Sequence, residues 1–236
     1  LEGVPTGTYS VRVSAPGGDS DTLDSAFTVL GAGSPRLETN LVLPSSLGRH
    51  AVATIYVEYA NTGSVAMPAP LLMLQSGDAD NSDRPLLTLD QTRVTQGFWT
   101  SARPDGFSDS VQFLASGSTP GILQPGESLR VPVYFAGLQQ PWNFSDNAVE
   151  FELRTLTSDD TTPVDWKALK AGLRPQGIDA DTWDAIFSNV VAQTGTTWGD
   201  YVRMLNDNAS YLGRLGQKVI DIGQLWSFEL QQANDL

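Results

Sequence analysis

The sequence predicts a mainly β fold, in which an antiparallel β-sandwich is followed by a small C-terminal α-helical domain. Two stretches support the β part, TIYVEYANTGSVA at 54–66 and LQPGESLRVPVYF at 123–135, because apolar and polar residues alternate in each beside a turn. Alternation with a period of two is typical of half-buried strands. After Pro163 the apolar residues instead recur every three or four positions, which indicates helices that bury one face.

Residues 1–33 are expected to form a β-hairpin followed by a linker. Apolar and polar residues alternate from Tyr9 to Val13, PGGD at 16–19 supplies a turn, and we expect the return strand to begin near Ala26. The segments GTYSVRV and AFTV resemble the closing strands of bacterial immunoglobulin-like repeats of the TIG kind. The earlier strands of such a repeat are missing, so the resemblance implies that the hairpin is the tail of a preceding repeat.

Residues 34–160 are expected to form the sandwich. Turn residues separate the strand candidates at the spacing typical of that architecture. The candidates are 37–43, 51–60, 65–74, 86–89, 94–99, 111–114, 128–135 and 149–156. Pro68 and Pro70 cannot donate ladder hydrogen bonds, so we expect the strand that contains them at a sheet edge.

The pair YANTG and LQPGES, within residues 37–157, resembles CARDB-like and related bacterial immunoglobulin-like modules. This resemblance implies an immunoglobulin-like topology for the sandwich. The later run TWGDYVRMLNDNASYLGRLG resembles segments of giant bacterial proteins of the RHS/YD-repeat kind. Together these resemblances imply a module of a large secreted or cell-surface bacterial protein.

Residues 161–236 are expected to form the helical domain. Helix signals are side chains that cap a first turn, and glycine or proline where a helix ends. We expect N-caps at Thr162, Asp179, Thr197 and Asp221, and helix ends at Arg174, at Gly195 and between Gly213 and Lys218. Pro163 would then occupy the first position of the first helix, and Asp200 would complete a capping box with Thr197.

Composition narrows the classes of function. The formal charge is −13, from 27 acidic and 14 basic residues, so we expect no nucleic acid partner, because phosphate binding requires clusters of lysine and arginine. We also expect no membrane insertion, because no apolar run approaches the roughly 20 residues that span a bilayer. The chain has no cysteine, which excludes disulfides and thiolate chemistry.

Candidate binding residues lie in loop-like segments. Asp78, Asp80 and Asp83 alternate in one such segment and are the candidate metal ligands, since calcium takes 6–8 hard oxygen ligands. The pattern departs from an EF-hand, so a solvated acidic loop is the alternative, and calcium is the one cofactor considered. Trp99 and Trp142 are the candidate ligand-binding residues, because a sugar ring can stack on an exposed indole.

Patterns for catalysis are weak. A serine triad would need His50, which is the single histidine, and no G-x-S-x-G elbow is present. Glu58, Glu150 and Glu152 fall within strands and are expected to face solvent. All three lysines lie in the helical tail, which excludes an isopeptide bond inside the sandwich. We therefore expect that the chain is not an enzyme.

The sequence as a whole predicts a structural spacer module whose partners are neighbouring domains of a parent protein. The lack of an initiator methionine or leader at Leu1 leads us to expect a piece of something longer. Two alternatives stay open: an adhesion module that binds a carbohydrate or a protein, and an accessory domain of a secreted hydrolase.

Overall fold

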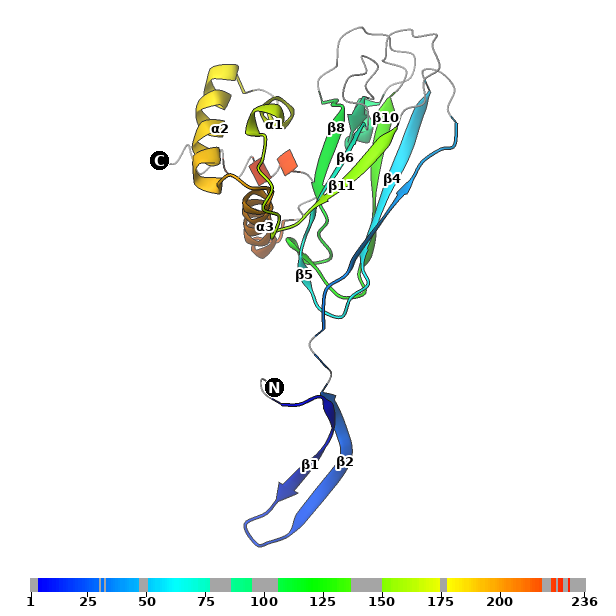
Figure 1. Cartoon of the computed structure of the whole chain (residues 1–236), viewed down its shortest axis with the longest axis vertical. Helices are drawn as coiled ribbons and strands as arrows, with labels where there is room; N and C mark the ends of the chain where they lie inside the picture. Colours follow the sequence, from blue (N-terminus) through cyan, green and yellow to red (C-terminus); the bar gives the residue numbers. More distant parts are fainter. Residues whose placement is uncertain are drawn as a thin grey trace.

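The computed structural model describes residues 4–29, 31, 33–46, 51–76, 86–94, 106–136, 150–174 and 178–217, together with 222, 223, 225, 226 and 229. In this part the chain is mainly β, with several antiparallel sheets, three α-helices and one short 3-10 helix, η1 (Gln91–Arg93). Figure 1 shows the helices on one side of the larger sheets. A hairpin lies at the end of the long axis opposite to both. The predicted mainly β fold is confirmed.

Two antiparallel sheets form the centre of the molecule. The first has the strand order β3 (Leu37–Val42), β4 (Val52–Asn61), β10 (Ser128–Ala136) and β7 (Leu87–Thr88). The second has the order β11 (Phe151–Leu156), β6 (Leu71–Ser76) and β8 (Ser110–Leu114). Strands β4 and β10 pair without a break along their length, and both were predicted from the alternation of apolar and polar residues.

A first core fills the space between these two sheets. From Ile55 onward every second residue of β4 is buried, and Ile55, Val57 and Tyr59 are at most 4% exposed. They contact inward side chains of the other sheet, among them Leu72 and Phe113. The Tyr59 hydroxyl donates a 2.9 Å hydrogen bond to the carbonyl of Ser116, and burial raises the pKa of Tyr59 to about 12.

The expectation of one edge strand at 65–74 is wrong. The segment divides into β5 (Met67–Pro68), which pairs with β9 (Ile122–Leu123), and β6, which is the central strand of its sheet. The physical reason is that Pro68 and Pro70 both precede β6. No ladder hydrogen bond of β6 therefore needs an N–H that proline lacks.

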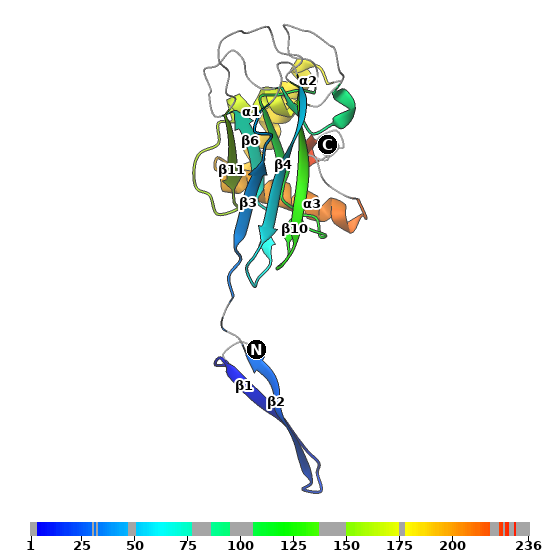
Figure 2. The ribbon, with the colours of Figure 1, turned by 90° about the vertical axis from the view of Figure 1, so that its right-hand side faces the viewer.

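The predicted hairpin is confirmed as β1 (Gly7–Ser14) and β2 (Ser20–Val29), which Figure 2 shows apart from the larger sheets. The return strand begins at Ser20, earlier than expected. The amide of Ala15 donates to the carbonyl of Asp19 at 2.8 Å, so the turn is already closed at that residue. A bulge then interrupts the pairing, and Ser25 has a φ of 53°.

The helices are α1 (Trp166–Leu173), α2 (Ala180–Thr194) and α3 (Trp198–Arg214). The predicted caps Asp179 and Thr197 are confirmed, as are the ends of α2 at Gly195 and of α3 before Leu215. The expected start of α1 is wrong, because Asp165 is its N-cap in place of Thr162. Predicted N-cap Asp221 lies outside the described residues.

Pro163 explains the late start of α1. It forms an isolated antiparallel bridge with Thr197, and the next amide, of Val164, donates to the carbonyl of Thr196 at 2.9 Å. These bonds hold the chain extended until Asp165, whose carboxylate accepts a hydrogen bond from the amide of Ala168. The start of α1 is thus fixed by contact with α3.

A second core lies between the helices and the outer face of the β11-β6-β8 sheet. Leu71, Leu114 and Leu156 of the sheet belong to it, together with buried side chains of α2 and α3, among them Tyr201 and Leu205, and of the C-terminal residues Ile222, Leu225 and Trp226. Leu71 thus lies in the second core, whereas its neighbour Leu72 lies in the first. The sheet is covered on both faces, and its strands join the two cores.

The tryptophans of the helical part form the centre of the second core. Trp183, Trp198 and Trp226 are 2%, 6% and 0% exposed, and Trp166 packs partly buried against them. No helix of the described part is both long and apolar enough to cross a membrane.

Candidate functional site

The predicted binding residues cannot be placed. Asp78, Asp80, Asp83, Trp99 and Trp142 lie outside the described residues, as does His50. The calcium site and the aromatic binding face therefore remain predictions. Within the described part of the chain, no group of three or more histidine, cysteine or acidic residues is arranged to hold a metal ion.

The described residues that flank these candidates gather at one end of the two sheets. Ser76, where β6 ends, pairs with Phe151, where β11 begins. Ala136, where β10 ends, pairs with Val52 of β4. The preceding residue, Phe135, pairs with Leu87 of β7. The segments that hold the candidate residues are 77–85, 95–105 and 137–149. The chain thus enters or leaves each of them at this end or beside it.

Strand carboxylates of the described part face solvent, as expected. Glu58 accepts a 2.8 Å hydrogen bond from the side chain of Asn40 and forms an ion pair with Arg130. The bond from Asn40, followed by that from Arg130, lowers the pKa of Glu58. Glu152 is exposed and accepts from Gln75 at 2.9 Å. A general acid would need a raised pKa. Glu58 is instead held in its charged form, as the ion-pair partner of Arg130 on the surface.

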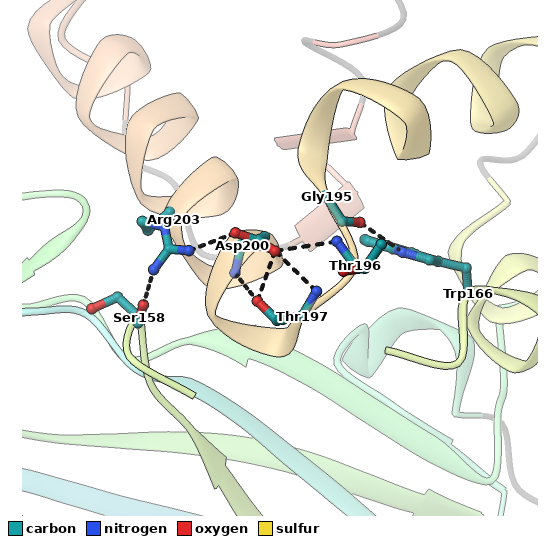
Figure 3. A network of polar contacts seen from close by, with 7 residues as sticks. All are labelled: Ser158, Trp166, Gly195, Thr196, Thr197, Asp200 and Arg203. Carbon is teal, nitrogen blue, oxygen red and sulfur yellow. Dashed lines mark hydrogen bonds and ion pairs between the residues drawn. The ribbon is translucent and has the colours of Figure 1, made fainter. Parts of the chain in front are cut away.

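The most developed polar site in the described chain is the junction between β11 and α3, drawn in Figure 3. Thr197 is the N-cap of α3, and its hydroxyl accepts from the amide of Asp200 at 3.1 Å. In return, one carboxylate oxygen of Asp200 accepts from the amides of Thr196 and Thr197 at 3.1 and 3.0 Å. This is the predicted capping box, with the Thr196 amide and the Thr197 hydroxyl as two additional donors to the same oxygen.

Hydrogen bonds to Asp200 stabilise its charged form. The Thr197 hydroxyl, then the Thr197 amide, then Arg203 lower the pKa of Asp200 from 3.8 to about 2. Because the folded-state pKa is depressed, this stabilisation is present at neutral pH and is lost as the pH falls through about 4 towards 2. The carboxylate acts as a fixed anion at the positive end of α3.

Arg203 ties this cap to the end of the sheet. Its guanidinium contacts the free carboxylate oxygen of Asp200 at 2.5 Å and donates to the backbone carbonyl of Ser158, just beyond β11. On the same side, the guanidinium of Arg154 lies over the ring of Trp198, 5.8 Å from its centroid. Side chains of both elements thus hold the helix start against the strand end.

Gly199 lets the backbones approach each other. Its amide donates to the carbonyl of Asp160 at 2.8 Å. A Cβ at this position would lie 2.7 Å from the carbonyl oxygens of both Ser158 and Asp160. Asp160 shapes the turn by accepting from the amide and hydroxyl of Thr162. Asp160 is therefore part of the junction.

Asn206, six residues after Asp200 on α3, forms a second contact between this helix and the β part of the chain. Its side-chain nitrogen donates to the carbonyl of Ala69 at 2.9 Å, and its side-chain oxygen accepts from the Ala69 amide at 3.1 Å. The residue is 8% exposed, so these bonds are shielded from water. The side-chain amide of Asn206 thereby pairs with both the backbone N–H and the backbone carbonyl of Ala69, which lies between β5 and β6.

Sequence reasoning missed Asn206. The available signal was a polar residue within the apolar stripe of a helix, next to Leu205 and one turn after Val202. Such residues are retained when they are fully hydrogen-bonded. Its partner lies 137 positions away, so no local pattern identified it.

Comparison with known proteins gives little similarity. No family model matches the chain, and no curated protein matches it. A solved structure described as "AvmM Catalyzes Macrocyclization in Alchivemycin A Biosynthesis" is similar to 50% of this chain and 85% of its own, with 13% identity and a TM-score of 0.28. A score this low does not establish a shared fold.

The comparison does correct one expectation. We expected that the chain is not an enzyme, and this expectation is withdrawn, because a solved structure among the matches is described as that of a catalyst. The similarity is too weak to assign an activity to this chain.

Proposed function

We propose that the chain is a structural module of a large secreted or cell-surface bacterial protein, in which it holds neighbouring parts of the polypeptide at a fixed spacing. In this proposal the paired sheets form an immunoglobulin-like sandwich, and the C-terminal helices form a small domain packed on it. The two packed antiparallel sheets and the resemblances in sequence support this interpretation. One observation carries it, namely the anchoring of the linker.

The linker between the hairpin and the sheets is hydrogen-bonded to the turn that follows β4. The Ser64 amide donates to the carbonyl of Ser34 at 3.1 Å, and the Thr62 amide donates to the carbonyl of Arg36 at 2.8 Å. Arg36 in turn donates its amide to the side chain of Asn61 at 3.2 Å. The hairpin ends at Val29, so only residues 30–33 separate it from this anchored stretch.

Asn61 and Gly63 make the anchor specific. Asn61 is fully buried, and its side chain also donates to the carbonyls of Val65 and Leu123 at 2.8 and 3.1 Å. A Cβ on Gly63 would lie 2.3 Å from the carbonyl oxygen of Ser34. This position therefore requires glycine for the linker to lie where it does.

Replacement of Gly63 by alanine is expected to release the linker. Because the added methyl group would overlap backbone atoms, we expect the amides of Thr62 and Ser64 to exchange with solvent at least about tenfold faster, as expected when hydrogen bonds worth about 1.4 kcal/mol are lost. Amide hydrogen exchange followed by NMR measures this directly, and the amide of Val133 in β10 reports the intact sheet.

Gly17→Ala is the matched control, because a Cβ there meets nothing within 4 Å. It should leave both amides unchanged. Rapid exchange of Thr62 and Ser64 in the unaltered chain would show a free linker and would contradict a fixed spacing.

A binding module is the second candidate. The observation that favours it concerns the described residues that flank these segments, which gather at the end of the sheets opposite the linker turn at Asn61. A surface there would be presented away from the linker, as an adhesion site would need.

Calcium tests this candidate. If Asp78, Asp80 and Asp83 bind the ion in the native state, the free energy of unfolding should rise by about 2.7 kcal/mol at a calcium concentration 100 times the dissociation constant. Thermal unfolding should show this rise in the unaltered chain and a smaller one in Asp80→Asn. An unchanged melting temperature at millimolar calcium would remove the metal site.

A further inference from the structure

We propose that one face of the β1–β2 hairpin is an interaction surface for an apolar β-sheet supplied by the same polypeptide ahead of Leu1. The hairpin and that sheet would together form the core of a preceding module. This inference rests on the proposed structural function and names its partner. It follows from the distribution of side chains on the two faces of the hairpin.

The pairing register places all the large apolar side chains of the hairpin on one face. Tyr9 lies opposite Phe27, and Val11 lies opposite Leu23, so the two strands share a face on both sides of the bulge. This apolar face carries Tyr9, Val11, Val13, Leu23, Phe27 and Val29, together with Asp21, which lies opposite Val13 beside the turn. The other face carries Thr8, Ser10, Arg12, Thr22 and Thr28.

Side chains of the polar face hydrogen-bond to one another across the two strands. Thr8 and Thr28 share a hydrogen bond of 3.2 Å between their hydroxyls, and Arg12 donates to Ser20 at 2.8 Å. The apolar face is not complete, because Val13 and Leu23 are 69% and 68% exposed. Val11 and Phe27 are also exposed. Such a contiguous patch on a two-stranded ribbon indicates a surface that is covered in the assembled protein.

The size of the face favours a partner in the same polypeptide over a second copy. β1 has eight residues, so the ribbon is about 26 Å long and about 10 Å wide. Two such faces would bury on the order of 500 Å², against roughly 1,200 Å² or more in stable complexes. A sheet in the same chain loses little translational freedom on docking, so a small face suffices.

The experiment compares residues 1–236 with the natural polypeptide extended towards its N-terminus. Hydrogen exchange of the β1 and β2 amides should be slowed at least about 100-fold in the longer chain, since its core must then open to expose them. Leu23→Asp should abolish that slowing. Thr22→Asp, on the adjacent but opposite face, should preserve it, and neither variant should change exchange in β4.

The proposal would be overturned by equal exchange of the hairpin in both chains, by equal effects of the two variants, or by a natural protein whose first residue is Leu1. A stable dimer of residues 1–236 at micromolar concentration that Leu23→Asp dissociates would instead assign the face to a second copy, and would also overturn it. The linker anchor at Thr62 and Ser64 is measured separately, so failure here is distinguishable from failure of the spacing function.

Discussion

Replacing Trp226 with alanine is expected to lower the free energy of unfolding by about 3–5 kcal/mol, the usual range for a buried aromatic side chain. Trp226 is 0% exposed, and its ring stacks on Phe187 with centroids 5.5 Å apart. It also lies 5.6 Å from the ring of Trp183, and its indole N–H donates to the hydroxyl of Tyr201 at 3.1 Å. The substitution would leave a cavity at the centre of the second core and an unpaired hydroxyl.

Urea denaturation measures this change. Leu215→Ala is the control, because Leu215 is also a large apolar residue near the end of α3 but is 60% exposed. Its effect should stay within about 0.5 kcal/mol. A loss below about 1 kcal/mol for Trp226→Ala would show that the second core does not depend on the C-terminal segment.

The second large effect is expected for Asn206→Asp. This change keeps the acceptor for the Ala69 amide but replaces the donor to the Ala69 carbonyl with an oxygen, and it introduces a charge at an 8% exposed position. Breaking a buried polar pair in this way costs about 3 kcal/mol. A protonated carboxyl group can donate again, so the loss should shrink when the pH is lowered to about 5, where a buried carboxyl with a raised pKa takes up a proton.

Asn189→Asp is the matched control, because Asn189 is exposed on α2 and its side chain accepts a long hydrogen bond from Gln193 at 3.4 Å. It should change stability by at most about 0.5 kcal/mol at any pH in this range. Equal losses for the two variants, or a loss for Asn206→Asp that does not depend on pH, would contradict the assigned contact with Ala69.

Local patterns in the sequence predicted the elements that depend on local chemistry. The alternation of β4 and β10 predicted both strands, because one face of each packs on the first core. The caps Asp179 and Thr197 were predicted because a side-chain acceptor there satisfies amides within its own helix. The hairpin was predicted from its turn, although not the early start of β2.

Features that depend on distant contacts were not predicted. Thr162 and Asp165 are both good N-caps by type, and the bridge between Pro163 and Thr197 decides between them. The division between β5 and β6 likewise depends on which strands are available to pair with each piece. Of the candidate sites, the capping partner Asp200 was expected, whereas the contacts of Gly199 and Asn206 with other elements were not.

We expect the helices and the sheets to open together, because β6 contributes Leu71 to one core and Leu72 to the other. Native-state hydrogen exchange in low urea tests it most directly, by comparing amides of α3 with amides of β6 in the unaltered chain and in Trp226→Ala. We predict that both sets open with the same free energy, and that Trp226→Ala lowers both by the same amount. Opening of α3 at a markedly lower free energy, with β6 unaffected by Trp226→Ala, would contradict the claim.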